Sequence, residues 1–447
     1  MAKVSQRLLL RVGGALAIAL TLSHPAQALD LLQAWNLTEA RAPSYAASQA
    51  GRQAEQEQVP QARSNLLPQI QAQAGGEQLD RRQTSKLSKH NNSQRATWSL
   101  SLSQSIVDRS AWYTLDQAQL QAQAADVQLA QTRQDLMLTL SQAYFDVLAA
   151  QDNLQTLHAQ RDAILTQLRA AEQMFELGGS TITDTYEAQS RLDLVRAQII
   201  HAENELRITQ DTLQSLTQEP AQNLAALRSE AVLPQPEPNN VVAWTEQASL
   251  NNLEVHKRAL LAEASAKKLA SASAEHEPTL ALKAQTGSAS DQALYGQQGG
   301  SRSLNSSVGL ELSIPLYTGG RTSSLIREQS SRMQQARHEH QQARLQAIQD
   351  SQRYYSGLHT GFARIQALAA AEHSSKLSVE ANQLGYEVGV RINIDVLNAQ
   401  QQLYQTQRDL AKARYDTVLN GLRLKASTGA LNETDLQAVN DMLEAAP

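Results

Sequence analysis

The sequence predicts a mostly helical, exported protein that also carries membrane β-strands and consists of two similar halves. Three observations support this fold class: an N-terminal secretion signal, long stretches of heptad-spaced apolar residues, and four short stretches in which apolar and polar residues alternate. The 447-residue chain is only 4% aromatic, so it has few large side chains for a broad globular core. It contains no cysteine, which excludes disulfide bonds.

The two halves are visible as a repeat with an offset of about 210 residues. Gly-Gly-Ser-Thr-Ile-Thr-Asp at 178–184 returns as Gly-Val-Arg-Ile-Asn-Ile-Asp at 389–395, and Pro68 returns as Pro278. We therefore expect four segments after the signal peptide. These are a first structural repeat at 29–218, a linker at 219–240, a second repeat at 241–430 and a C-terminal tail at 431–447, with the hairpins described below inside the repeats.

Residues 1–28 have the pattern of a signal peptide. Lys3, Arg7 and Arg11 precede a short apolar run, and Ala-Gln-Ala at 26–28 is a typical cleavage signal. An uncleaved anchor is the alternative, although the run is short for a bilayer span. Cleavage would change the net charge from −5 to −8, and an acidic mature chain does not indicate nucleic acid as a partner.

Most of the mature chain has the pattern of long coiled-coil helices. Apolar or small residues follow spacings of three and four from Leu136 to Phe175, interrupted only by Arg161, and again from Leu192 to Leu216. Residues 108–175 contain neither Pro nor Gly, so a continuous helix there would be about 100 Å long. Polar residues on the other faces suit helices wetted on both sides, as in the wall of a tube. A plain fibrous coiled coil is the alternative that heptads leave open.

Four segments instead repeat every two residues and form two expected β-hairpins, at about 67–106 and 278–316. Each segment has one apolar and one polar face, as when Val308, Leu310 and Leu312 alternate with polar or small residues. A soluble hairpin is the alternative for any single segment. Four strands cannot close a barrel, so several chains must share one; eight strands leave no lumen, whereas twelve from three chains do.

Signals for catalysis or metal binding are weak. His338 and His340 lie two residues apart in a helical stretch, so they point to different faces and make a poor metal pair. Gly319-Gly320 is followed by no phosphate-binding signature and indicates a turn. We expect no enzyme activity, no catalytic residues, no cofactor and no metal.

The segments around Gly178 and Gly389 interrupt helical sequence, and each ends in an aspartate, Asp184 or Asp395. Two long helices can reverse direction at each of these segments. The alternative role for either aspartate is to cap the N-terminus of the following helix.

The chain resembles the TolC family of trimeric outer-membrane channels over nearly all of residues 29–443. The resemblance is strongest in Gly-Tyr-Glu-Val-Gly-Val-Arg-Ile-Asn-Ile-Asp-Val-Leu-Asn-Ala at 385–399 and continues in Gly-Ala-Leu-Asn-Glu-Thr-Asp-Leu at 429–436. It implies a trimeric twelve-stranded outer-membrane β-barrel, with four strands per chain, continuous with a periplasmic α-barrel of twelve coiled-coil helices.

The resemblance also implies a function and partners. The expected function is a passive exit duct in the outer membrane of a Gram-negative cell, extending into the periplasm, for type I protein secretion, multidrug efflux or both. Its partners would be two further copies of itself, outer-membrane lipid, a periplasmic adaptor (membrane fusion protein), and an inner-membrane ABC exporter or proton-driven efflux pump. A secreted structural coiled-coil protein and a periplasmic adaptor are the rival interpretations.

In this family, links between the coils of the two repeats close the periplasmic end. Tyr386 and Arg391 match positions that bond across to Asp184 and Thr183. Asp395 matches an acidic ring that lines the aperture, and Asn398 stands where the family's archetype has a second aspartate. We therefore expect one carboxylate ring instead of two and a weaker attraction for cations at the aperture.

Overall fold

The computed structural model describes residues 28–83, 89–221, 223–228, 230–231, 233–294 and 301–444. The expected signal peptide up to residue 27, the tips of both hairpins and the last three residues of the tail lie outside the described residues.

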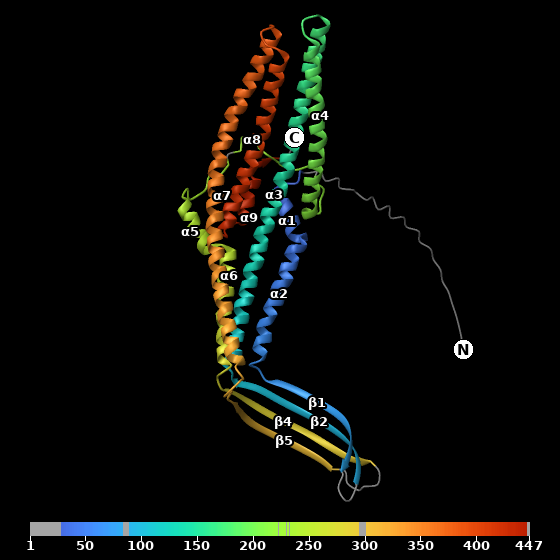
Figure 1. The fold of residues 1–447 in the computed structure, drawn as a ribbon, viewed down its shortest axis with the longest axis vertical. Coiled ribbons are helices and arrows are strands. Elements are labelled where there is room, and N and C mark those ends of the chain that lie inside the picture. The colour runs from blue at the N-terminus through green and yellow to red at the C-terminus, as the bar shows by residue number, and fades with distance from the viewer. Residues whose placement is uncertain are drawn as a thin grey trace, which may run out of the picture.

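The described chain is mostly helical with a few strands, as the sequence predicted (Figure 1). In chain order its elements are α1 (Leu31–Arg41), α2 (Pro43–Ser64), β1 (Gln69–Gln83), β2 (Lys89–Val107), α3 (Arg109–Glu176), α4 (Ile182–Thr217), β3 (Ala226–Leu227), α5 (Val241–Asn251), α6 (Leu253–Ala274), β4 (Thr279–Leu294), β5 (Ser301–Ser313), α7 (Arg321–Glu387), α8 (Asn393–Ser427), α9 (Glu433–Asn440) and β6 (Leu443–Glu444).

Two helices, α3 and α7, run most of the length of the molecule (Figure 1). They contain 68 and 67 residues, so each is about 100 Å long. Asp108 begins α3 directly after β2, because its carboxylate accepts a hydrogen bond from the amide of Ala111 at 3.0 Å. Among the described residues, no helix combines the length and apolar composition that crossing a bilayer requires.

The four long strands form one antiparallel sheet in the order β1-β2-β4-β5 at one end of the molecule. Ile70 lies opposite Leu102, Leu102 opposite Ala284, and Ala284 opposite Val308, so the apolar residues of all four strands share one face. Large side chains on this face are exposed, up to 78% at Val308. In the single chain, β1 and β5 are both edge strands.

The helices form two tiers, joined by a belt. Nearest the sheet, α2, α3, α6 and α7 lie side by side, and beyond the belt the coils α3/α4 and α7/α8 extend to the far end (Figure 1). The belt holds the largest buried cluster, with Trp35, Tyr144 and Phe145 almost wholly inaccessible. In the same region β3 pairs with β6, which joins the linker to the C-terminal tail.

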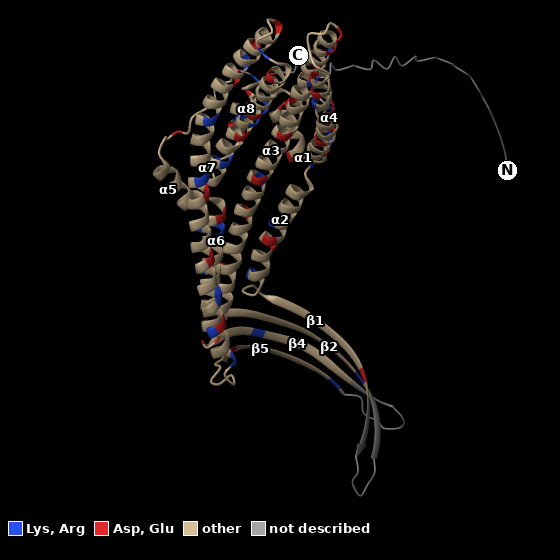
Figure 2. Ribbon diagram, turned by 45° about the horizontal axis from the view of Figure 1, so that its top comes forward, with Lys and Arg blue, Asp and Glu red and all other residues tan. Residues whose placement is uncertain are grey.

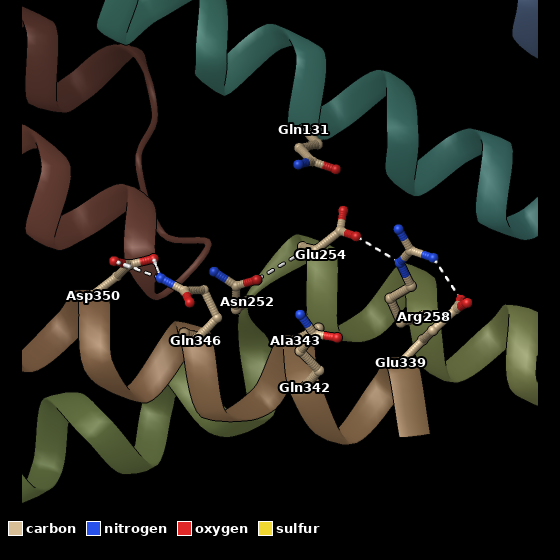
Figure 3. Close-up of a pocket in the computed structure, with 10 residues that line it drawn as sticks. Gln131, Asn252, Glu254, Arg258, Glu339, Gln342, Ala343, Gln346 and Asp350 are labelled. Atoms are coloured by element: carbon tan, nitrogen blue, oxygen red, sulfur yellow. Dashed lines mark hydrogen bonds and ion pairs between the residues drawn. The ribbon is translucent and has the colours of Figure 1, made fainter. Parts of the chain in front are cut away.

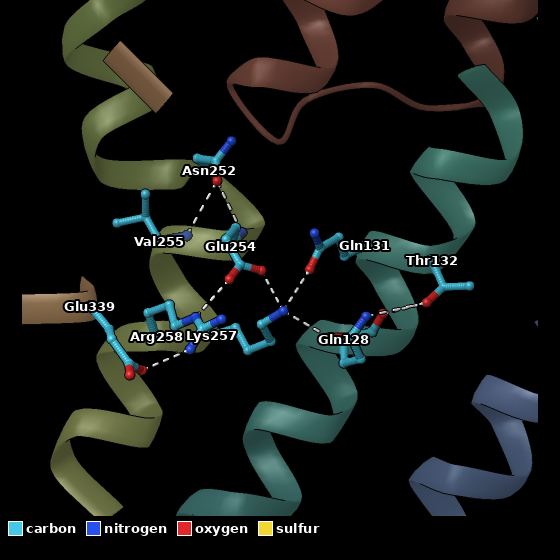
Figure 4. A network of polar contacts seen from close by, with 9 residues as sticks. All are labelled: Gln128, Gln131, Thr132, Asn252, Glu254, Val255, Lys257, Arg258 and Glu339. Carbon is cyan, nitrogen blue, oxygen red and sulfur yellow. Dashed lines mark hydrogen bonds and ion pairs between the residues drawn. The ribbon is translucent and has the colours of Figure 1, made fainter. Parts of the chain in front are cut away.

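Ion pairs fasten the helices of the tier nearest the sheet. Figure 2 shows charged residues spread along the helices and sparse on the described strands. Arg258 of α6 pairs with Glu254 on its own helix at 2.7 Å and with Glu339 of α7 at 2.9 Å (Figures 3 and 4). Lys257 donates from Nζ to the side-chain oxygens of Gln128 and Gln131 on α3, at 2.8 and 3.0 Å (Figure 4). One polar network thus holds α3, α6 and α7 together.

A polar cavity of about 570 Å³ lies beside this network, between α6 and α7 (Figure 3). Its carboxylates are already engaged, since Glu254 and Glu339 pair with Arg258, and Asp350 accepts hydrogen bonds from Gln346 at 3.2 Å. Within the described residues, no three His, Asp or Glu side chains are grouped so as to hold a metal ion. We interpret the cavity as a wetted part of the helical wall.

Candidate functional site

The candidate site lies at the far ends of the two coils, where α3 turns into α4 and α7 turns into α8 (Figure 1). Gly178 and Gly389 both have φ of +76°, a left-handed conformation that L-residues rarely adopt. Each glycine follows the last turn of its helix, and so the two halves reverse direction in the same way. The coils touch close to this end, because Leu397 of α8 packs in a cluster with Ala188 and Leu192 of α4.

Asp184 caps the N-terminus of α4. Its Oδ2 accepts hydrogen bonds from the amide and hydroxyl of Thr181, at 3.1 and 2.9 Å, and from the hydroxyl of Ser180 at 3.1 Å. In the single chain this carboxylate therefore caps the helix, which is the alternative role that the sequence left open. The neighbouring Thr183 is exposed on the first turn of the same helix.

The structure places Tyr386 close to Asp184 but directs Arg391 elsewhere. Burial and the negative charge of Asp184 raise the pKa of Tyr386, whose hydroxyl is buried without a hydrogen-bond partner in the described part of the chain. Arg391 lies 3.6 Å from Asp395, four residues along in its own coil. The links expected from the sequence, from Tyr386 and Arg391 to Asp184 and Thr183, therefore remain a prediction.

Asn393 joins the two coils, although the sequence analysis did not single it out. It is the first residue of α8 and is 1% exposed. Its Oδ1 accepts a hydrogen bond from Nε2 of Gln167 on α3 at 2.7 Å, and its Nδ2 donates to the main-chain carbonyl of Asp184 at 3.1 Å. A polar residue among β-branched neighbours was the only sequence signal available.

A second connection involves Asn398, which the resemblance placed at the aperture. Arg191 of α4 donates from Nη2 to Oδ1 of Asn398 at 3.0 Å and from Nη1 to Oε1 of Gln401 at 2.5 Å. The two acceptors lie three residues apart on one side of α8, so a single guanidinium bridges two helical turns. Asp395, the expected aperture carboxylate, is half-buried on the first turn of α8.

Further from the tips, side chains of α8 donate hydrogen bonds to two amides and to one partly buried carboxylate of α3. Arg408 donates to Gln160 at 3.1 Å and Arg423 to Gln142 at 2.6 Å. The hydroxyl of Tyr415 donates to Asp152 at 2.7 Å. Burial raises the pKa of Asp152, and this hydrogen bond opposes the increase.

Comparison with known proteins finds the same family in both halves of the chain. The model of a family described as outer membrane efflux protein matches residues 34–218 and again residues 244–430. The outer membrane protein TolC of Vibrio cholerae is 32% identical over 434 residues, which cover 95% of this chain and 96% of that protein. The alkaline protease secretion protein AprF of Pseudomonas aeruginosa is 29% identical, covering 95% of this chain and 89% of that protein.

Among solved structures, the CmeC outer membrane channel of Campylobacter jejuni has the same fold. Its crystal structure aligns with a TM-score of 0.80 over 98% of both chains, although the sequences are only 14% identical.

Proposed function

This chain belongs to the outer membrane efflux protein family, and we propose that it is the passive exit duct of a tripartite export system for type I protein secretion, multidrug efflux or both. The protein is located in the outer membrane and extends into the periplasm. On this proposal, a periplasmic adaptor connects the duct to an inner-membrane ABC exporter or proton-driven pump, which supplies the energy. The family is one of membrane channels and not of enzymes.

The observation that carries this proposal is the four-stranded sheet with an exposed apolar face and two open edges. Unpaired edges cannot lie in lipid, because their amides and carbonyls would have no hydrogen-bond partners. Pairing β1 of each chain with β5 of a neighbour closes a twelve-stranded barrel from three chains. The same three chains supply twelve helices to the wall at either tier, and the duplication makes the six half-chains nearly equivalent.

The junction between sheet and helices supports this placement in the membrane. Large side chains there are exposed: Leu316 is 92% exposed, Tyr317 87%, Trp112 55% and Leu67 50%. Aromatic and apolar side chains of this kind favour the boundary between lipid and water. We place the periplasmic face of the outer membrane at this collar, which we define as Leu67, Trp112, Leu316 and Tyr317.

The ends of the two coils form the gate of the proposed duct, with Thr183, Asp184, Tyr386 and Arg391 as closing links and Asp395 and Asn398 at the aperture. Replacing Arg391 with Ser should loosen this end and raise single-channel conductance in planar bilayers. An unchanged conductance would show that the gate has been assigned to the wrong residues, while leaving the duct itself in place.

The proposed function is tested with the purified full chain in detergent and in planar bilayers. We expect a trimer by analytical ultracentrifugation, resistance to dissociation in mild detergent, and discrete conductance steps after reconstitution. A secreted coiled-coil protein or a periplasmic adaptor would remain soluble without detergent and give no conductance steps, and that outcome would overturn the proposal.

A further inference from the structure

Asn393 is a buried amide whose hydrogen-bonding groups are engaged on both sides. Its carbonyl oxygen accepts from Gln167 at 2.7 Å and its amino group donates to the carbonyl of Asp184 at 3.1 Å. Gln167 is also buried, with 5% of its surface exposed. One side chain of the second repeat is therefore bonded to both helices of the first.

The repeat offers a direct comparison for this position. Ile182 is the first residue of α4, as Asn393 is the first residue of α8, but its side chain is apolar and 42% exposed. The two turns have the same backbone geometry, with φ of +76° at Gly178 and at Gly389. The amide is thus a feature of one repeat only, and the general shape of the turn does not require it.

We propose that Asn393, together with Gln167, is a latch that positions α8 against α3 and α4 and so stabilises the closed form of the duct. This inference rests on the proposed function of a gated channel. The Arg191 bridge to Asn398 and Gln401 supports the same arrangement about one to two turns further along α8. The Asn393 connection joins only neutral groups, so it is less sensitive to salt concentration than an ion pair would be.

A latch of this kind is reversible. When α8 separates from α3 and α4, water replaces the protein partners of the exposed amides, so each hydrogen bond contributes only about 1 kcal/mol net. Removing the Asn393 amide leaves the Gln167 amide without its acceptor in the closed form, while the Asp184 carbonyl keeps only its helical partner. In the open form water hydrates both groups. The closed form alone is destabilised.

The first test replaces Asn393 with Leu, which has a similar volume and no polar group. We expect the open fraction of single channels to rise about fivefold or more, the factor equivalent to about 1 kcal/mol. Gln167→Met should act in the same direction because it removes the donor from the other helix. Ile182→Leu, at the equivalent place in the first repeat, is the matched control and should leave the open fraction unchanged.

The second test uses Asn393→Asp and distinguishes a latch from general weakening of the fold. At neutral pH the new carboxylate still accepts from Gln167 but cannot donate to the Asp184 carbonyl. Once protonated, it both accepts and donates, as the amide does. We expect the open fraction relative to wild type to be raised at pH 7.5 and to return toward one as the pH falls through the pKa of this group, which burial places above about 4.

The outcomes separate the two proposals. A wild-type channel that conducts, together with Asn393→Leu and Asn393→Asp variants that open no more often, would overturn the latch and leave the duct intact. An equal rise in the Ile182→Leu control, or no return of Asn393→Asp at low pH, would also overturn it. A wild-type protein without conductance would instead contradict the proposed function.

Discussion

The two coils beyond the belt have the same backbone arrangement but different seams. In α3/α4, Ile164, Leu168, Leu192 and Val195 are all at least 95% buried. In α7, no residue after Leu358 is buried. The α7 residues equivalent to Ile164 and Leu168 in the other repeat are the half-buried Ser375 and Val379. The two coils therefore share a backbone geometry without sharing the apolar burial that stabilises one of them.

Polar groups line part of the α7/α8 seam, and one of them, Ser375, stands where the other coil has Ile164. Glu372 of α7 accepts a hydrogen bond from Gln407 of α8 at 3.0 Å, in a stripe that also includes Ser375 and Asn382. Polar seam positions contribute less to stability than buried Leu or Ile. On the proposed function, α3/α4 would be the more rigid coil and α7/α8 the coil that shifts when the proposed gate opens.

The largest expected effect comes from truncating equivalent leucines in the two seams. Leu192 is 1% exposed in α4, and Leu403 is its half-buried counterpart in α8. Leu192→Ala should lower the local stability of α4 by about 3 kcal/mol, whereas Leu403→Ala should lower that of α8 by about 1 kcal/mol. Hydrogen–deuterium exchange of the two helices measures both values. Equal losses would contradict the distinction between a rigid and a weak coil.

A second prediction makes the weak seam resemble the strong one. Ser375→Ile introduces the residue found at the equivalent position, Ile164, and should stabilise α7/α8 by about 1–2 kcal/mol through added apolar burial. Slower amide exchange around residues 365–382 and a smaller open fraction are the expected results. Ser374→Ile is the control because Ser374 is exposed, and an equal effect there would remove the seam as the explanation.

A third prediction concerns the buried connection between α3 and α8. Because the pKa of Asp152 is raised in the folded state, folding favours its protonated form, and stability falls as the pH rises from about 4 through that raised value. Asp152→Asn retains an acceptor for the Tyr415 hydroxyl without the buried charge. The variant should therefore have a higher melting temperature than wild type at neutral pH, and the difference should shrink toward pH 4. A pH-independent difference would show that ionisation of Asp152 is not involved.

The smallest expected effect is at Asn398. A carboxylate introduced by Asn398→Asp should increase cation selectivity and block by divalent cations, but only slightly, because Arg191 lies at hydrogen-bond distance and partly neutralises it. Combining it with Arg191→Gln should enlarge both effects. Reversal potential and block that match wild type in both variants would contradict the expectation of a single carboxylate ring.

The helices and strands with a strong local hydrophobic period could be predicted from the sequence. Strict alternation marks β4 and β5, and the absence of Pro and Gly from residues 108–175 anticipates α3 at Arg109–Glu176. The pairing of β2 with β4 could not be predicted, because no local sequence pattern indicates which strands of the two hairpins become neighbours. Nor was the pairing of β3 with β6, since two-residue strands carry no period.

The candidate site was predictable in position but only partly in its bonding. The paired interruptions around Gly178 and Gly389 located both turns, and capping by Asp184 was one of the alternatives. Asn393 was missed because a single Asn between two Ile residues reads as a surface position. Its burial arises only when α3, α4 and α8 converge, and this depends on tertiary packing.

The open edges of β1 and β5 have a consequence for how the protein is made. On the proposed trimer, a newly exported chain has no complete membrane surface of its own, so it cannot enter the bilayer before it meets its neighbours. Insertion and assembly must then be a single event, and the cell must keep each sheet from pairing with the wrong chain until three are present. The level of functional channel would therefore depend steeply on the rate of synthesis, since every duct requires three chains to meet.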